Sequence, residues 1–388
     1  MKLRIGIVAA EPSGDVLAAD LMDELKSQYS EIEFEGIGGK CMEAKGFKSY
    51  APIESLSIMG LFEVIRYLPK IFQLRQSLIK RWEKNKPHIF IGIDAPDFNI
   101  FLERRLKRIG VITIHYVCPS VWAWRKKRIK KLYRSIDLLL NIFPFEEKIL
   151  NESNIKHLYV GHILASKIPL KVDRQAARIR LNIKKEENVL AILPGSRASE
   201  VKRLSRPFIE TALVCKNEIP SLHIIVPLAN ELTISIWKSQ LKMYAPDLSV
   251  QIVQSDTATA ITASNVVLVA SGTATLEGVL CKRPMVVGYK LNFLTYFYIK
   301  IFHLLKIKHF SLANILSERK SAPEFVQNLC EPHNLAPKVL DFFRNKEKIQ
   351  KIEEEYLEIH KTLLMDTNKL IANAILDLAK KIKPSPKN

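Results

Sequence analysis

The chain has 388 residues, of which 47% are hydrophobic and 26% charged, so it is long enough for two globular domains and too apolar to be disordered. Its five cysteines form no Cys-x-x-Cys pair, which argues against a disulfide scaffold or a cysteine zinc site and suits a reducing cytosol. The net charge is +19, and residues 64–134 alone hold 18 Lys/Arg against 4 Asp/Glu. Such a positive field attracts polyanions, anionic lipid surfaces or phosphorylated substrates.

The first half of the chain alternates short apolar runs with segments of helical period, which is typical of a parallel sheet with right-handed crossovers. We expect strands at residues 5–9, 34–37, 89–93, 113–117, 138–142 and 158–160, and a helix at 14–28. No apolar region of signal-peptide length follows the basic N-terminus. The apolar stretch 291–305 is too short to span a bilayer.

The second half repeats this pattern. We expect strands at residues 189–193, 223–226, 250–253, 266–270 and 285–288, followed by a charged helical end at 342–382. The predicted fold class is α/β, with two doubly wound Rossmann-like domains facing a cleft and a C-terminal helical tail. The expected boundaries are 1–168 for the first domain, 169–341 for the second and 342–388 for the tail.

Polar side chains follow two neighbouring strands of the first domain. Asp94, Asp97 and Asn99 come directly after the apolar run 89–93, and His115 and Tyr116 end the next run. Open α/β sheets bind ligands beyond the carboxyl ends of their strands, so these residues are candidates for a substrate cleft. A carboxylate here suits a general base towards a sugar hydroxyl better than a metal ligand. The structural alternative is an Asx turn around Pro96.

An anion loop is predicted where the first helix begins. Glu11, Ser13, Gly14 and Asp15 combine capping residues with a glycine at a helix N-terminus, where free N–H groups and the helix dipole favour an anion. The segment is neither a dinucleotide fingerprint nor a Walker loop. A plain helix cap is the competing interpretation.

Two further anion loops are predicted in the second domain, and two such loops are more telling than one. In the first loop, a glycine lets a ligand come close to the backbone, and an arginine can donate two parallel hydrogen bonds to a phosphate. In the second, hydroxyls and N–H groups open a helix whose carboxylate, four residues on, suits ribose hydroxyls. The candidate nucleotide-binding residues are Gly195, Ser196, Arg197, Ser271, Gly272, Thr273 and Glu277. The alternative is capping with solvated charges.

The segment 58–82 is strongly apolar and leads into a run of Lys and Arg. Large apolar side chains beside basic residues suit the plane of a membrane interface. The candidate membrane or acyl-chain residues are Leu61, Phe62, Leu68 and Phe72. A core helix with a solvated basic face explains the same pattern equally well.

Six segments resemble lipid-A-disaccharide synthase, a family of inverting glycosyltransferases with two Rossmann-like domains. They are residues 11–15 (EPSGD), 91–99 (IGIDAPDFN), 121–125 (VWAWR), 193–197 (LPGSR), 270–274 (ASGTA) and 284–289 (PMVVGY). The resemblance implies transfer of the diacylglucosaminyl group from UDP-2,3-diacylglucosamine to 2,3-diacylglucosamine 1-phosphate. The products are the β-1,6 disaccharide of lipid A and UDP. We expect Asp97 to be the catalytic base and Asp94 a supporting carboxylate, because Asp97 lies further along the loop and should project more into the cleft. The resemblance adds Asn314 to the UDP site.

We expect a cytoplasmic enzyme that its apolar and basic segment holds peripherally at the inner membrane. We expect no cofactor, metal or nucleic-acid partner, and a homodimer is possible. Three positions depart from the family pattern: Cys118 stands in place of serine, Ala313 in place of proline and Ser166 near a usual aspartate. Other nucleotide-sugar enzymes of this fold, such as UDP-N-acetylglucosamine 2-epimerase or the undecaprenyl-lipid glycosyltransferase, are the enzymatic alternatives. A basic RNA- or membrane-binding protein is the non-catalytic one.

Overall fold

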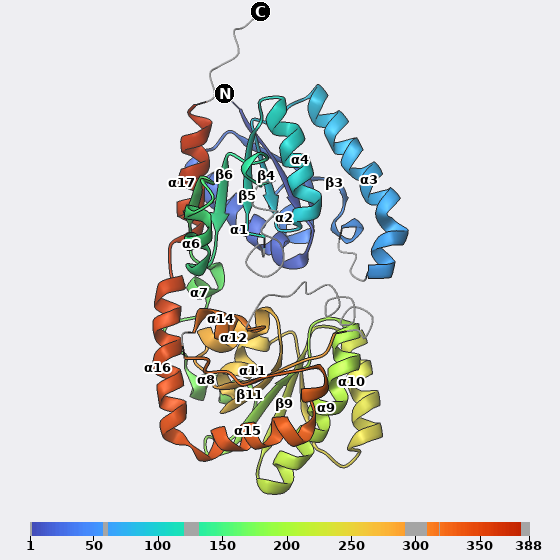
Figure 1. Ribbon diagram of the computed structural model, residues 1–388, viewed down its shortest axis with the longest axis vertical. Helices are drawn as coiled ribbons and strands as arrows, with labels where there is room; N and C mark the ends of the chain where they lie inside the picture. The colour runs from blue at the N-terminus through green and yellow to red at the C-terminus, as the bar shows by residue number, and fades with distance from the viewer. Residues whose placement is uncertain (1, 57–60, 120–131, 292–308, 318, 382–388) are drawn as a thin grey trace, which may run out of the picture. The chain divides into compact units, whose positions relative to one another are not determined.

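The computed structural model describes residues 2–56, 61–119, 132–291, 309–317 and 319–381. The chain divides into two compact units (Figure 1). Unit 1 contains residues 1–166 and the C-terminal residues from 363, and unit 2 contains most of residues 167–362. Each unit is built on one parallel sheet, so the predicted pair of doubly wound α/β domains is confirmed.

Unit 1 has a seven-stranded sheet in the order β3-β2-β1-β4-β5-β6-β7. Its strands are β1 (Leu3–Ala9), β2 (Ile32–Gly38), β3 (Lys48–Pro52), β4 (Ile89–Ile93), β5 (Ile112–Tyr116), β6 (Leu138–Asn141) and β7 (His157–Tyr159). Its helices are α1 (Pro12–Gln28), α2 (Lys40–Ala44), α3 (Leu61–Lys84), α4 (Pro96–Arg108), α6 (Phe145–Asn151), α7 (Ile163–Lys167) and α17 (Thr367–Ala379), with a short 3₁₀ turn at Ile53–Ser55. The order reverses direction between β1 and β4, which is the switch point where such sheets bind ligands.

Unit 2 has a six-stranded sheet in the order β10-β9-β8-β11-β12-β13. Its strands are β8 (Val189–Leu193), β9 (His223–Leu228), β10 (Gln251–Gln254), β11 (Val266–Ala270), β12 (Met285–Tyr289) and β13 (Glu324–Val326). Its helices are α8 (Arg174–Arg180), α9 (Ala198–Glu218), α10 (Glu231–Tyr244), α11 (Thr257–Ala263), α12 (Thr273–Leu280), α14 (Leu312–Leu316), α15 (Pro332–Arg344) and α16 (Lys346–Leu363), with a 3₁₀ turn at Gln327–Leu329. The switch point lies between β8 and β11.

The central strands are fully buried because helices cover both faces of each sheet. Every residue of β4, β8 and β11 is buried, which is why these strands read as unbroken apolar runs. The C-terminal helices divide between the units: α16 belongs to unit 2, whereas α17 packs against α1 of unit 1. The Thr367 hydroxyl, at the start of α17, donates to the carbonyl oxygen of Val160 at 2.8 Å and so anchors this helix to unit 1.

Candidate functional site

The loop between β4 and α4 holds a strained backbone. Asp94 and Ala95 both adopt positive φ angles, 52° and 41°, and Val117 at the end of neighbouring β5 has φ 75°. Such angles cost about 1–3 kcal/mol for each non-glycine residue and cluster at functional sites. The strain is held by hydrogen bonds: Asp94 donates its backbone N–H to the Tyr116 carbonyl oxygen at 3.0 Å. The strained backbone therefore marks this end of the sheet as a candidate functional site.

Asp97 lies in the first turn of α4, which begins at Pro96. Proline suits this position because a helix start needs no N–H there. The Asp97 side chain is exposed, whereas Asp94 is half-buried. The structure thus puts the expected base where a substrate can reach it.

Asn99 is buried, which differs from its expected place as a cleft residue. Its side-chain amide donates to the carbonyl oxygen of Asp94 at 2.8 Å and lies 3.4 Å from those of Val8 and Ile93. Three carbonyl groups at strand ends share one amide, so Asn99 holds the loop in place and cannot line an open cleft.

His115 and Tyr116 are likewise fully buried, so the expectation that they line a cleft needs correction. In a parallel strand with both faces covered, a polar residue near the end still points into a helix layer. His115 Nδ1 lies 2.6 Å from Oε1 of Glu103, a buried carboxylate on α4 that the sequence reasoning did not single out. Burial raises the pKa of Glu103, while His115 opposes the shift.

The 11–15 loop follows β1, whose Ala9 pairs with Ile93 of β4, so this loop and Asp94 leave the same edge of the sheet. Ser13 is exposed and Glu11 half-buried. A Cβ on Gly14 would lie 3.4 Å from Ile93 Cγ2, so α1 passes close to the sheet. These positions are compatible with the predicted anion loop.

Asp15 has a different role from the one expected. Its carboxylate is buried and accepts backbone N–H groups from Gly39, Cys41 and Met42 at 2.8–3.1 Å. These are N–H groups at the start of α2, so Asp15 caps that helix from across the fold. Its oxygens are therefore committed to the protein, not to a cleft.

Unit 2 contains a cavity of about 290 Å³ at the carboxyl ends of β8 and β11. Both expected anion loops line it. The lining residues already predicted from the sequence are Gly195, Ser196, Arg197, Ser271, Gly272, Thr273 and Glu277. Sequence reasoning missed Glu200, Pro227, Ala229, Thr257 and Tyr289, which also line it. Tyr289 ends β12 and follows the same strand-end rule, which could have identified it.

The first loop of the cavity requires glycine. Gly195 has φ 119°, and a Cβ there would lie 2.6 Å from the Glu200 Cβ. Arg197 is the N-cap of α9, with its Nη1 3.3 Å from Glu200 Oε1. The Arg197 side chain is 47% exposed, so it can still reach a ligand. An arginine at a helix N-terminus suits a phosphate group.

The second loop places α12 with its N-terminus at the cavity. Gly272 is the N-cap, and Thr273 is exposed beside it. Ser271 instead donates its hydroxyl to the Phe310 carbonyl at 2.7 Å, so the protein already uses that proton. Burial raises the pKa of Glu277 to about 7, so near neutral pH this carboxyl can be ionised or protonated.

Asn314 does not line the cavity, contrary to expectation. It is buried, and its side-chain amide donates to Ala322 O at 2.6 Å and Glu324 Oε1 at 3.0 Å while its oxygen accepts from Ala322 N–H. These bonds join α14 to β13. Asn314 therefore stabilises the segment beside α12, where Leu312 N–H donates to Thr275 Oγ1 at 3.2 Å.

The apolar segment divides along α3. Leu68 and Phe72 are 50% and 51% exposed, as a surface that meets apolar ligands requires, whereas Leu78, Ile79 and Trp82 are buried. The side chains of Leu61 and Phe62 lie outside the described part of the structure, as does the stretch 292–305. Across the helices that the structure describes, none has the length and hydropathy needed to cross a bilayer.

The three departures from the family pattern are accommodated locally. Cys118 is buried, and burial raises the pKa of its thiol. Ala313 is buried in α14, and Ser166 donates its hydroxyl to the Ile163 carbonyl at 3.0 Å within α7. None of these residues lines the cavity of unit 2.

Comparison with solved structures identifies the architecture. The chain is similar to UDP-GlcNAc 2-epimerase from Neisseria meningitidis bound to UDP-GlcNAc, with a TM-score of 0.64, 12% identity and coverage of 97% of this chain and 100% of that one. It is also similar to S. aureus MnaA in a co-structure with UDP, with a TM-score of 0.67, 12% identity and full coverage of both chains. At this identity the likeness establishes the fold alone, a GT-B-type chain with two parallel-sheet α/β domains.

Comparison of sequences is more specific. The family model described as lipid-A-disaccharide synthetase matches residues 5–376. The lipid-A-disaccharide synthase of Xanthomonas campestris pv. campestris (strain 8004) is 43% identical over 97% of this chain and 86% of its own length. That of Vibrio campbellii is 42% identical over 98% and 99%. These matches do not favour the epimerase or the non-catalytic alternatives. The chain therefore belongs to the lipid-A-disaccharide synthase family, the glycosyltransferases that build the lipid A disaccharide.

Proposed function

We propose that the chain transfers the glucosaminyl group of UDP-2,3-diacylglucosamine to 2,3-diacylglucosamine 1-phosphate. The observation that carries this proposal is the convergence of two helix N-termini and Arg197 on the cavity of unit 2, in a chain that matches the family along its length. A cavity of about 290 Å³ suits the nucleotide part of the donor. Solved structures of this fold that hold UDP or UDP-GlcNAc support a UDP-sugar as the donor.

In this proposal Arg197 and the N-terminus of α12 bind the diphosphate, and Glu277 accepts hydrogen bonds from the ribose hydroxyls. The charges that bind the diphosphate also stabilise it as it departs, because negative charge grows on its oxygen in the transition state. Thr273 adds an exposed hydroxyl at the helix start. In this proposal, Arg197 and the N-terminus of α12 neutralise the diphosphate without a metal ion.

Asp97 is proposed as the general base. It takes the proton from the acceptor 6-hydroxyl as that oxygen attacks the anomeric carbon and the bond from this carbon to the diphosphate oxygen breaks. The donor linkage is α and the product linkage is β, so one in-line displacement with inversion suffices. Asp94 has a supporting role, because its strained backbone fixes the start of α4 on which Asp97 lies.

The exposed Leu68 and Phe72 are proposed to meet the acyl chains and the cytoplasmic face of the inner membrane. Acylated sugars are poorly soluble, so an enzyme that uses them gains from an apolar surface. The basic side chains that follow along α3 favour an anionic lipid surface.

Calorimetric titration with UDP tests the nucleotide site. Arg197→Ala should weaken UDP binding by about 1.5–3 kcal/mol, because the phosphate loses a charge-assisted pair. Arg206→Ala is the matched control, since Arg206 lies on the same helix, is exposed and pairs with Glu210. Equal UDP affinity in wild type and Arg197→Ala would contradict the placement.

A further inference from the structure

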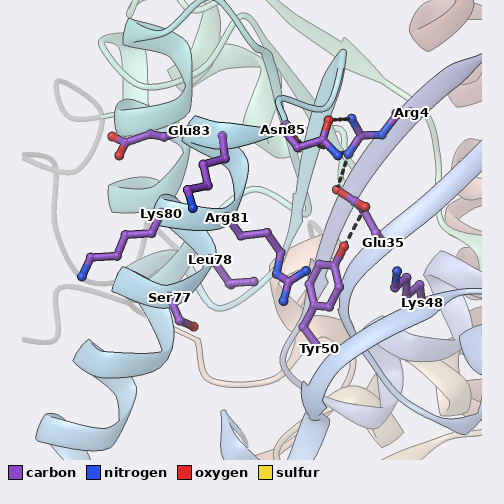
Figure 2. A pocket seen from close by; sticks show the side chains of 11 residues that line it. Arg4, Glu35, Lys48, Tyr50, Ser77, Leu78, Lys80, Arg81, Glu83 and Asn85 are labelled. Carbon is purple, nitrogen blue, oxygen red and sulfur yellow. Dashed lines mark hydrogen bonds and ion pairs between the residues drawn. The ribbon is translucent and has the colours of Figure 1, made fainter.

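Unit 1 contains a second hollow, which the proposed reaction does not use. It has a volume of about 820 Å³ and lies against the C-terminal half of α3 (Figure 2). Arg4 and Lys48 reach it from the beginnings of β1 and β3. Asp94 follows the carboxyl end of β4, a parallel strand of the same sheet. The hollow and the candidate catalytic loop therefore lie at opposite ends of the strands.

The lining of this hollow is strongly basic. Five cations, Arg4, Lys48, Lys80, Arg81 and Lys84, share it with two carboxylates. Lys80 and Lys84 are four residues apart on α3 and therefore lie on one face of the helix. We call this hollow the basic pocket.

Both carboxylates of the basic pocket are already engaged. Glu35 accepts from Arg4 Nη2 at 3.0 Å and from the Tyr50 hydroxyl at 2.7 Å (Figure 2), and it also accepts from Trp82 Nε1 at 2.8 Å. Glu83 pairs with Arg105 at 3.0 Å. Neither carboxylate is therefore left to neutralise the lysines.

Arg81 is held in a fixed orientation. Its guanidinium lies 4.1 Å from the centroid of the Tyr50 ring, and Figure 2 shows the two groups stacked beside Glu35. The Tyr50 hydroxyl is tied to that carboxylate, so the ring forms a firm platform. A planar, oriented guanidinium, in a pocket that lysines also line, matches the tetrahedral oxygens of a phosphate group.

We infer that the basic pocket binds a phosphate-bearing anion, either free or as a lipid headgroup. The lining combines apolar surface, including Leu78 and the Tyr50 ring, with an excess of positively charged hydrogen-bond donors. The group that these donors recognise is therefore anionic. Bringing it in relieves the mutual repulsion of Lys48, Lys80, Arg81 and Lys84.

Residue-resolved lysine acetylation, followed by mass spectrometry on the full chain, tests this inference with pyrophosphate as the probe. Saturating UDP is present throughout, to occupy the proposed nucleotide site. Pyrophosphate should protect Lys48, Lys80 and Lys84 several-fold, compared with sodium chloride of equal ionic strength. Lys238 and Lys242, an exposed i,i+4 pair on α10, should be unaffected.

The double variant Lys80→Gln/Lys84→Gln should lose the protection of Lys48, whereas the charge-matched Lys238→Gln/Lys242→Gln should keep it. Vesicles of phosphatidic acid in phosphatidylcholine form the second arm, with pure phosphatidylcholine as the control. Protection by pyrophosphate identifies a free anion as sufficient, and protection by phosphatidic acid alone identifies a lipid headgroup. The inference is overturned if neither probe protects, if the α10 lysines are protected equally, or if only a short RNA protects.

Discussion

The side-chain amide of Asn99 donates a hydrogen bond of 2.8 Å to the carbonyl oxygen of Asp94. This bond joins the first turns of α4 to a residue with φ 52°, and it is made inside the core, because Asn99 is fully buried. Gly92 leaves the necessary space: a Cβ there would lie 2.8 Å from the Asn99 Cβ and 2.4 Å from Glu103 Oε1. The position of Asp97 thus depends on buried residues that no substrate touches.

Replacing Asn99 tests this dependence. Asn99→Ala should lower kcat about tenfold or more with little change in UDP affinity, because a small misplacement of a catalytic group is enough to slow the reaction. Steady-state kinetics and calorimetry with UDP measure the two quantities. Asn141→Ala is the control: Asn141 is also buried in unit 1 and donates to one carbonyl, that of Phe143. If Asn99→Ala and Asn141→Ala lose kcat equally and have equal melting temperatures, Asn99 has no special role in positioning Asp97.

Asp97 and Asp94 should respond differently to removal of charge. Asp97→Asn should lower kcat by roughly 10²–10⁴ and leave UDP binding nearly unchanged, because the general base is lost. Asp94→Asn should cost less, since asparagine tolerates the positive φ of this position. Single-turnover kinetics on both variants separates the roles. A crippled Asp94→Asn beside an active Asp97→Asn would reverse the assignment.

The pH dependence of UDP binding tests Glu277. Burial raises its pKa to about 7, and in the proposed role the ionised form accepts hydrogen bonds from two ribose hydroxyls. UDP affinity should therefore rise as the pH increases through 7, by up to about tenfold between pH 6 and 8. Glu277→Gln keeps one acceptor, so it should bind UDP somewhat less well and with a flatter pH profile. Titration of UDP itself affects the wild type and the variant in the same way. If their two pH profiles of UDP affinity are parallel, Glu277 does not contact the ribose.

The exposed apolar pair on α3 gives a prediction about membranes. Leu68→Ser/Phe72→Ser should reduce flotation with anionic vesicles and activity on acylated substrates, while the melting temperature stays close to wild type, because neither side chain is in the core. Added salt should release part of the wild type, since basic residues contribute about 1 kcal/mol each near such a surface. Leu232→Ser/Met243→Ser removes two apolar side chains from α10 that are even more exposed, and it serves as the control. Unchanged flotation of the α3 variant, or a matching fall in its melting temperature, would contradict membrane docking.

Much of the fold could be predicted because buried parallel strands carry their own signal. Residues 89–93, 189–193 and 266–270 form strands with the predicted bounds. Two strands were missed, β3 and β13, because both are half-buried edge strands with no unbroken apolar run. Without burial on both faces, these two strands lack the continuous apolar pattern of the central ones.

The candidate site was harder to predict. Sequence position shows that a residue follows a strand, but not which way its side chain points. Asp15, His115 and Asn314 have the expected chemistry and still turn into the protein, where a helix start, Glu103 and β13 engage them. The two loops at the unit 2 cavity were predictable because glycine and helix-start residues specify local geometry without long-range contacts.

UDP release by the purified protein, measured in the presence of EDTA, tests the proposed reaction most directly. The account predicts release only when UDP-2,3-diacylglucosamine and 2,3-diacylglucosamine 1-phosphate are both present, with one β-1,6-linked disaccharide 1-phosphate formed for each UDP. Release that needs only the donor, or that EDTA abolishes and a divalent cation restores, would contradict it.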